Sequence, residues 1–229
     1  MCQIATTENN YAPLPISFYQ RSAIEVAPDL LDCLLIRQLG DKLLIGRISE
    51  TEAYLQDDPA SHSFNGETKR NVVMFGVAGR AYVYFTYGMH HCLNVTTGKK
   101  GAGEAVLIRS LEAIQGLEQM GSNRRLEGVN YSVSTSSQGF FKRISLSHSL
   151  CGGPAKICQA FAIDLSCNGD DLTLPGKIWI AQPDPEISNS ESPAKTVESP
   201  RIGIRKATDR LLRYTRQNEL FASRKQPLS

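Results

Sequence analysis

The stretch that decides the fold is GRAYVYFTYGMHHCLN, residues 79–94. Its residues alternate with a period of two, which places Tyr82 and Tyr84 on one face of a strand. Gly88 is a natural turn residue, so a second strand is expected to return after it, with Tyr87 near the tip. The stretch therefore predicts a β-hairpin that carries an aromatic ring at its exposed end.

Shorter signals along the chain predict further strands and a few helices. Residues 42–54 and 104–110 are rich in aliphatic residues and read as strands. Helices are predicted at residues 28–35, 112–121 and 153–163. Several antiparallel strands with few helices indicate an α+β fold.

Two stretches of the chain have the composition of surface loops. Residues 124–147 are rich in serine, and residues 183–200 are rich in Pro, Ser and Glu. Both are predicted to be loose and irregular. Neither separates two plausible cores, so we expect residues 1–229 to form a single domain.

Composition indicates a globular protein. The chain has 229 residues, of which 41% are hydrophobic and 21% charged, enough to bury a sizeable core. No apolar run approaches the roughly 20 residues that span a membrane. The first ten residues have neither the basic flank nor the apolar centre of a secretory signal, so we expect an intracellular protein, in a bacterial cytoplasm or a nucleus.

Metal-binding signatures are lacking in the sequence. Six cysteines and four histidines occur, and the cysteines show no close pairs of the kind that hold zinc or an iron–sulfur cluster. In an intracellular protein the default for such cysteines is the reduced thiol. We therefore expect no metal and no cofactor.

The positive charge of the chain gathers at its C-terminal end. Residues 200–229 carry eight basic and two acidic residues, whereas the rest carries 17 basic and 21 acidic residues. A basic segment on a near-neutral body suits a polyanionic partner. A solvated surface segment is the alternative that charge alone leaves open.

Two carboxylates and a tyrosine alternate in the pentapeptide Glu-Thr-Glu-Ala-Tyr that ends at Tyr54. On a strand Glu50 and Glu52 share a face, about 6.6 Å apart at about 3.3 Å per residue. A polar strand face would explain them equally well. A carboxylate that directs water, next to aromatic rings that stack on a base, is also what a base-excising enzyme requires.

These blocks, taken in order, resemble the alkyladenine (3-methyladenine, methylpurine) DNA glycosylase family. The resemblance covers roughly residues 14–223. It is carried by ISETEAY (residues 48–54), ASHS (60–63), YVYFTYGM (82–89) with Asn94, AVLIRSLE (105–112) and CGGPAKICQA (151–160). It implies a curved antiparallel sheet with flanking helices and a protruding hairpin.

The resemblance also implies residue roles in catalysis. Glu52 matches the residue that activates water, and Arg109 matches an arginine beside that water. Tyr54, His62 and Tyr84 match an aromatic pocket that stacks on a flipped base. Such stacking suits alkylated purines because these are often cationic and cations bind the faces of aromatic rings.

Further matching positions imply how DNA is held. Tyr87 matches the residue that intercalates where the nucleotide has left, and stacking there recovers about 1–3 kcal/mol of the flipping cost. Asn94 matches an asparagine that crowds the exocyclic amino group of guanine. Met89 is also predicted to contact the DNA backbone, as are Arg201 and Arg205 because of the positive charge of the C-terminal segment.

The expected partner is therefore double-stranded DNA that contains damaged purines. We expect the protein to be a monomer and not to bind a membrane. The alternative is a non-catalytic nucleic-acid-binding module that uses the aromatic hairpin and the basic C-terminal segment. Such a module would not need Glu50 or Glu52 beside the aromatic rings, because carboxylates repel phosphate. A lyase that works through a Schiff base would need a lysine in the site, for which Lys69 is the nearest candidate.

Overall fold

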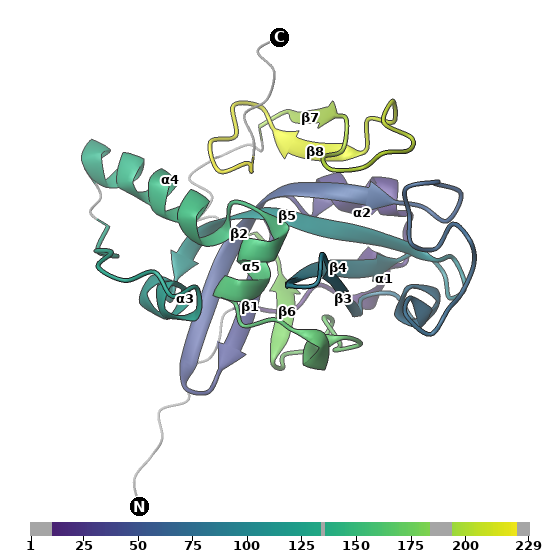
Figure 1. Cartoon of the computed structure of the whole chain (residues 1–229), viewed down its shortest axis with the longest axis horizontal. Coiled ribbons are helices and arrows are strands. Elements are labelled where there is room, and N and C mark those ends of the chain that lie inside the picture. The colour runs from purple at the N-terminus through teal and green to yellow at the C-terminus, as the bar shows by residue number, and fades with distance from the viewer. Residues whose placement is uncertain (1–10, 134–135, 184–193, 224–229) are drawn as a thin grey trace, which may run out of the picture.

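The computed structural model describes residues 11–133, 136–183 and 194–223, and within them one antiparallel sheet with helices packed around it (Figure 1). The strands are β1 (Leu34–Leu39), β2 (Lys42–Tyr54), β3 (Ala81–Thr86), β4 (His90–Thr97), β5 (Glu104–Gln115), β6 (Ile178–Ala181), β7 (Thr196–Ser199) and β8 (Arg213–Arg216). The helices are α1 (Ile16–Tyr19), α2 (Ala23–Asp29), α3 (Leu117–Asn123), α4 (Ser137–Cys151) and α5 (Pro154–Ala160), with 3₁₀ turns η1 (Val72–Phe75) and η2 (Leu165–Cys167).

The two longest strands, β2 and β5, form the centre of the sheet. The strand order is β3-β4-β5-β2-β1-β6, and β8 pairs with both β2 and β7. The pairing of β2 with β5 shifts register on both sides of Glu50. Such irregularities bend a strand and increase its twist, which fits the curved half-barrel form of this sheet. The predicted α+β single domain with a curved antiparallel sheet is confirmed.

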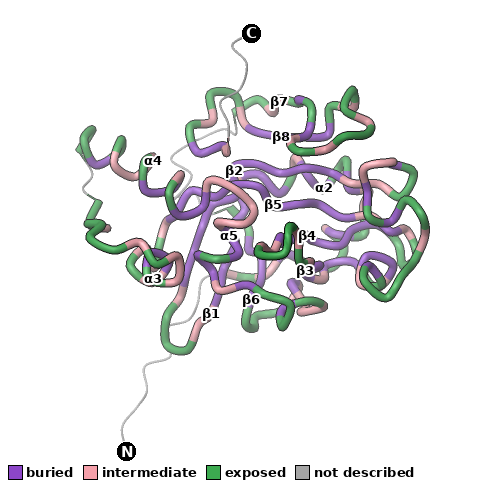
Figure 2. The backbone as a smooth tube through the Cα atoms, in the orientation of Figure 1, coloured by how far each residue is buried: buried purple, intermediate pink, exposed green. Residues whose placement is uncertain are grey.

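The core lies between the sheet and the helices that cover it. Figure 2 shows β2 and β5 buried along nearly their whole length, while the connecting loops are exposed. Helix α2 begins at a capping box in which Ser22 and Glu25 exchange hydrogen bonds. That cap starts the helix earlier than predicted, so the chain is already a strand at Leu34. The predicted helix at residues 28–35 is therefore wrong.

The predicted hairpin is present, and the helix predicted at residues 112–121 begins later than expected. Strands β3 and β4 pair in register from Ala81 with Val95 to Thr86 with His90. Strand β5 continues to Gln115, and the helix that was expected from residue 112 starts only after Gly116, whose φ is +81°. The helix predicted to follow residue 153 is confirmed as α5.

The prediction that residues 124–147 form a loose loop is wrong over its second half. Helix α4 starts at Ser137 because the Ser136 side chain accepts a hydrogen bond from the Gly139 amide. Leu146 and Leu150 lie one turn apart and are buried. Of the other predicted loop, residues 184–193 lie outside the described residues, and its last part includes β7.

Candidate active site

Glu52 is the centre of a hydrogen-bonded cluster on β2. Its side chain is 0% exposed. The Tyr54 hydroxyl donates to Oε2 over 2.8 Å, and the Ile202 amide donates to Oε1 over 2.7 Å. Arg109 Nη1 lies 3.3 Å from the same Oε1. The carboxylate is therefore buried, yet held by one charged and two neutral donors.

The two glutamates of β2 experience opposite electrostatic effects. Burial raises the pKa of Glu52 above its usual value, and Arg109 and the two neutral donors only partly offset that rise. Burial acts the same way on Glu50, but Arg109 and Arg213 outweigh it and lower the Glu50 pKa. Glu50 thus stays ionised at neutral pH between two arginines, whereas Glu52 is the carboxylate suited to take a proton.

Three aromatic rings lie next to this cluster. His62 and Tyr84 have ring centroids 4.5 Å apart at an interplanar angle of 76°, and Tyr82 lies 5.6 Å from Tyr84. The Tyr82 hydroxyl is 3.0 Å from Nδ1 of His62. Partial burial and the nearby Arg70 lower the pKa of His62, which favours a neutral imidazole at neutral pH.

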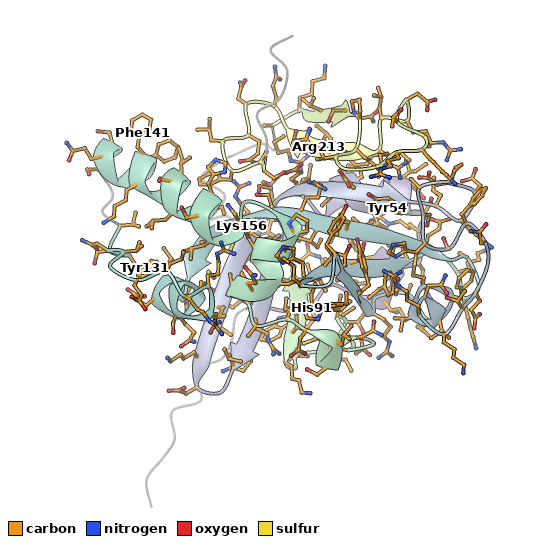
Figure 3. All side chains as sticks on the ribbon, viewed as in Figure 1. Tyr54, His91, Tyr131, Phe141, Lys156 and Arg213 are labelled. Carbon is orange, nitrogen blue, oxygen red and sulfur yellow. The ribbon has the colours of Figure 1, made fainter. Side chains whose placement is uncertain are left out.

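A pocket of about 480 Å³ opens over these groups. The predicted residues that line it are Tyr54, His62, Tyr84, Tyr87, Asn94, Arg109 and Arg205. Figure 3 shows Tyr54 within the body of the molecule, while Phe141 lies at the far end of α4. The structure therefore brings the predicted base-pocket residues around one cavity, and Glu52 lies behind its wall.

Asn94 lies on β4 and is part of the pocket wall. It is 4% exposed, and its amide nitrogen donates to the Tyr82 carbonyl over 3.2 Å. That bond fixes the orientation of the side chain across the hairpin. Asn94 therefore presents a fixed shape to whatever enters the pocket.

Tyr87 lies at the turn of the hairpin with its ring in solvent. Its side chain and that of Met89 are 84% and 68% exposed. The φ of Tyr87 is +51°, a left-handed conformation that costs a residue other than glycine about 1–2 kcal/mol. An exposed ring on a strained backbone is typical of a residue kept for a function.

Comparison with known proteins assigns the chain to a family. A family model described as "Methylpurine-DNA glycosylase (MPG)" matches residues 17–220. The chain belongs to the methylpurine-DNA glycosylase family. The resemblance seen in the sequence is thereby confirmed.

Individual members of this glycosylase family are similar to this chain over nearly their whole length. A protein of Carboxydothermus hydrogenoformans is 44% identical over 212 residues, which are 93% of this chain and 99% of that protein. One of Methanoculleus marisnigri is 42% identical, with the same two coverages. One of Francisella tularensis subsp. tularensis is 42% identical over 88% of this chain and 94% of that protein. Each bears the name "Putative 3-methyladenine DNA glycosylase".

Arg201, which the sequence predicts to contact the DNA backbone, is buried in this family member. Its side chain is 0% exposed and is paired with Asp58. It also donates to the Ala53 carbonyl over 3.0 Å, and its guanidinium carbon lies 4.6 Å from the centroid of the Tyr54 ring. Arg205, by contrast, is exposed at the rim of the pocket, as is Lys206.

Several residues of the pocket and of the Glu52 cluster were missed from the sequence. Tyr82 was placed on the face of Tyr84 by the alternation, but its bond to His62 was not foreseen. Cys92 also lines the pocket and shares a hydrogen bond with the Tyr84 hydroxyl. The Ile202 amide carried no signal, because any residue except proline provides such a donor.

Residues 11–133, 136–183 and 194–223 contain no group of three or more His, Cys, Asp or Glu side chains that could hold a metal ion. In the same residues no helix combines the length and apolar character that a membrane crossing needs.

Proposed function

We propose that the protein flips damaged purines, alkylated or deaminated, out of double-stranded DNA and hydrolyses their N-glycosidic bond. The observation that carries this proposal is the Glu52 cluster behind an aromatic pocket. Glu52 is a carboxylate of raised pKa, and Tyr54 and Arg109, which contact it, also line the cavity. A base stacked there would place its sugar close to the carboxylate.

The reaction follows from these positions. The bond between the base and C1′ of the sugar breaks, the base keeps the electron pair, and the sugar becomes cationic. Negative charge on Glu52 stabilises that cation. A water molecule adds to C1′ and passes its proton to Glu52, which then releases it to solvent. A cationic alkylated purine leaves as the neutral base, whereas a neutral purine such as hypoxanthine leaves as its anion and takes up one proton from solvent. The products are an abasic site and the free base. No covalent link to Lys69 forms, so the product strand is not cut by this step.

The test uses duplex DNA with one 1,N6-ethenoadenine or hypoxanthine. Incubation with the protein followed by hot alkali should cut the strand at the lesion, and omission of alkali should leave it intact. Strand cutting without alkali would point to the lyase. Tight binding of the duplex with no alkali-sensitive site would favour the non-catalytic binding module.

We propose that Tyr87 is the wedge that fills the gap left by the extruded nucleotide. Tyr87→Ala should lower the fraction of extruded base, because stacking worth about 1–3 kcal/mol is lost. Thermal stability should change little, since the ring is 84% exposed. A fluorescent purine opposite thymine reports the extruded fraction. Unchanged extrusion together with a large fall in melting temperature would make Tyr87 a structural residue.

We further propose that Asn94 excludes guanine by shape. Asn94→Ser removes about two heavy atoms from the pocket wall and leaves Glu52 in place. Release of 7-methylguanine should therefore rise relative to release of hypoxanthine by roughly ten- to a hundredfold, as expected when one steric conflict of about 1–3 kcal/mol is relieved. Single-turnover assays on two matched duplexes measure the ratio. An unchanged ratio would assign the exclusion of guanine to another wall.

A further inference from the structure

The Arg201–Asp58 pair joins three separate walls of the pocket. Arg201 precedes Ile202, whose amide contacts Glu52. Its guanidinium donates to the carbonyl of Ala53 on β2 and stacks on the ring of Tyr54. Asp58, its ionic partner, lies in the loop that leads to the base-pocket residues near position 62, and also accepts the Ala60 amide over 2.9 Å.

Two of the buried donors of this arginine have no partner in the described part of the chain. Nε and Nη2 of Arg201 are buried and have no hydrogen-bond partner among the described residues. Buried donors without partners are rare, and a buried ion pair often stabilises less than apolar residues of the same size. Stability alone therefore does not explain why an arginine occupies this position.

The contacts of Arg201 lead to the two neutral donors that hold the Glu52 carboxylate. Two neutral donors hold the Glu52 carboxylate, and Arg201 contacts the ring of one, Tyr54, and is covalently adjacent to the other, Ile202. We propose that Arg201 is a positioning residue that keeps the Tyr54 hydroxyl and the Ile202 amide on the Glu52 carboxylate. The inference rests on the proposed role of Glu52 as the group that activates water.

The consequence for Glu52 has a definite sign. Hydrogen bonds from neutral donors stabilise the ionised carboxylate, so their loss makes protonation easier. Base release needs the ionised form. As the pH is lowered, the rate should therefore begin to fall at a higher pH in a variant without Arg201 than in the wild type. The other titratable or charged groups around Glu52 are Glu50 on β2, Arg109 on β5, Arg213 on β8, Tyr84 on β3, Cys92 on β4 and Asp58 in the following loop. They are unchanged in the variants below, apart from Asp58.

The decisive variant removes the whole ion pair. Arg201→Met with Asp58→Asn leaves no unpaired buried charge, and Tyr54→Phe removes only the hydroxyl. The matched control is Arg210→Met with Asp57→Asn, because this neighbouring pair is held over 3.4 Å at the surface and touches neither donor. The control makes the same change of charge in the same two segments.

The first measurement titrates Glu52 directly, without any substrate. Carbon-13 NMR of glutamate-labelled protein follows the Glu52 carboxyl signal, which the Glu52→Gln spectrum identifies. The titration midpoint should rise by about one pH unit, a tenfold change in the ionised fraction, in the Arg201–Asp58 double variant and in Tyr54→Phe. It should stay at the wild-type value in the Arg210–Asp57 double variant.

The second measurement follows base release from a hypoxanthine duplex against pH and salt. In the Arg201–Asp58 double variant, the acid limb of the pH–rate profile should shift to higher pH by the same amount. Above that limb, the rate of base release should be near that of the wild type. An unmoved midpoint and limb in the Arg201–Asp58 variant, with Tyr54→Phe shifted, would overturn the proposal.

The salt dependence separates this role from DNA contact. A phosphate contact at Arg201 would reduce the salt slope of DNA binding by about one, as is expected for Arg205→Met. That result in the Arg201–Asp58 variant would also overturn the proposal. If wild-type protein releases no base from any lesion, the proposed function fails, but the NMR midpoints still decide the role of Arg201.

Discussion

Glu52→Gln should abolish base release while the variant still binds lesion-containing DNA. Glutamine keeps the size of the side chain but cannot take a proton from water, and general bases contribute about 10²–10⁴-fold to a rate. The amide would also turn a donor group toward either Tyr54 or Ile202, both of which donate to the carboxylate now. The expected result is a loss of at least about a hundredfold in single-turnover release.

The control for this experiment is Glu118→Gln, which changes an exposed glutamate on α3 that does not line the pocket. It should release base at the wild-type rate. Gel-shift binding of both variants to a hypoxanthine duplex checks that DNA recognition survives. Comparable turnover by Glu52→Gln and the wild type would assign water activation to another residue.

The pH dependence of the wild-type enzyme follows from the same carboxylate. Burial raises the pKa of Glu52 from the ordinary 4.5, so a larger fraction is protonated at mildly acidic pH. Release should therefore begin to fall, as the pH is lowered, at a value above about 4.5. A rate that stays constant through pH 4.5 would mean that the ionisation of Glu52 does not limit the reaction.

The sequence predicted the parts of the site that local patterns specify. The alternation across residues 81–86 defines a strand, and a glycine at the turn leaves Tyr87 exposed, because both signals depend only on near neighbours. Helix α4 was missed because its packing depends on residues that are distant in the sequence. Its serines suggested a loop, yet Ser147 accepts the Ala113 amide over 3.0 Å in the folded core.

Contacts between distant segments could not be predicted. Arg201 was assigned to DNA from the charge of its segment, whereas its partner Asp58 lies 143 residues earlier in the chain. Only the pairing of β8 with β2 and the return of the chain over Tyr54 bring the two together. A charged residue has the same appearance in a sequence whether it faces solvent or a buried partner.

Glu50→Gln should cause the largest loss of stability among the substitutions considered. The Glu50 side chain is 0% exposed, and its Oε1 pairs with Nε of Arg109 over 3.3 Å and with Nε of Arg213. Its Oε2 accepts the Ser223 amide over 2.6 Å. Arg213 is the first residue of β8, which pairs with β2 and lies beside it in Figure 3, so this carboxylate ties the C-terminal segment to the central strand.

Neutralising Glu50 leaves two buried arginines with one anionic partner fewer. Removal of one member of a buried pair costs about 3–5 kcal/mol, and in a domain of this size each kcal/mol lowers the melting temperature by about 2–4 °C. The melting temperature should therefore fall by on the order of 10 °C at pH 7. Base release per folded molecule should fall much less than in Glu52→Gln, since Arg109 still contacts Glu52.

The free energy of unfolding at acid pH shows whether Glu50→Gln loses stability through the missing charge or through a packing defect. Arg109 and Arg213 outweigh burial and lower the pKa of Glu50, so its contribution is complete above about pH 4.5 and is lost as the pH falls through the lowered value. The difference in unfolding free energy between wild type and Glu50→Gln should therefore shrink below pH 4.5, while Glu118→Gln should follow the wild type throughout. Urea unfolding at a series of pH values measures both. A difference that stays constant down to the lowest pH at which both proteins fold would show that glutamine fails at this position because of shape, and that the charge of Glu50 does not hold the two arginines.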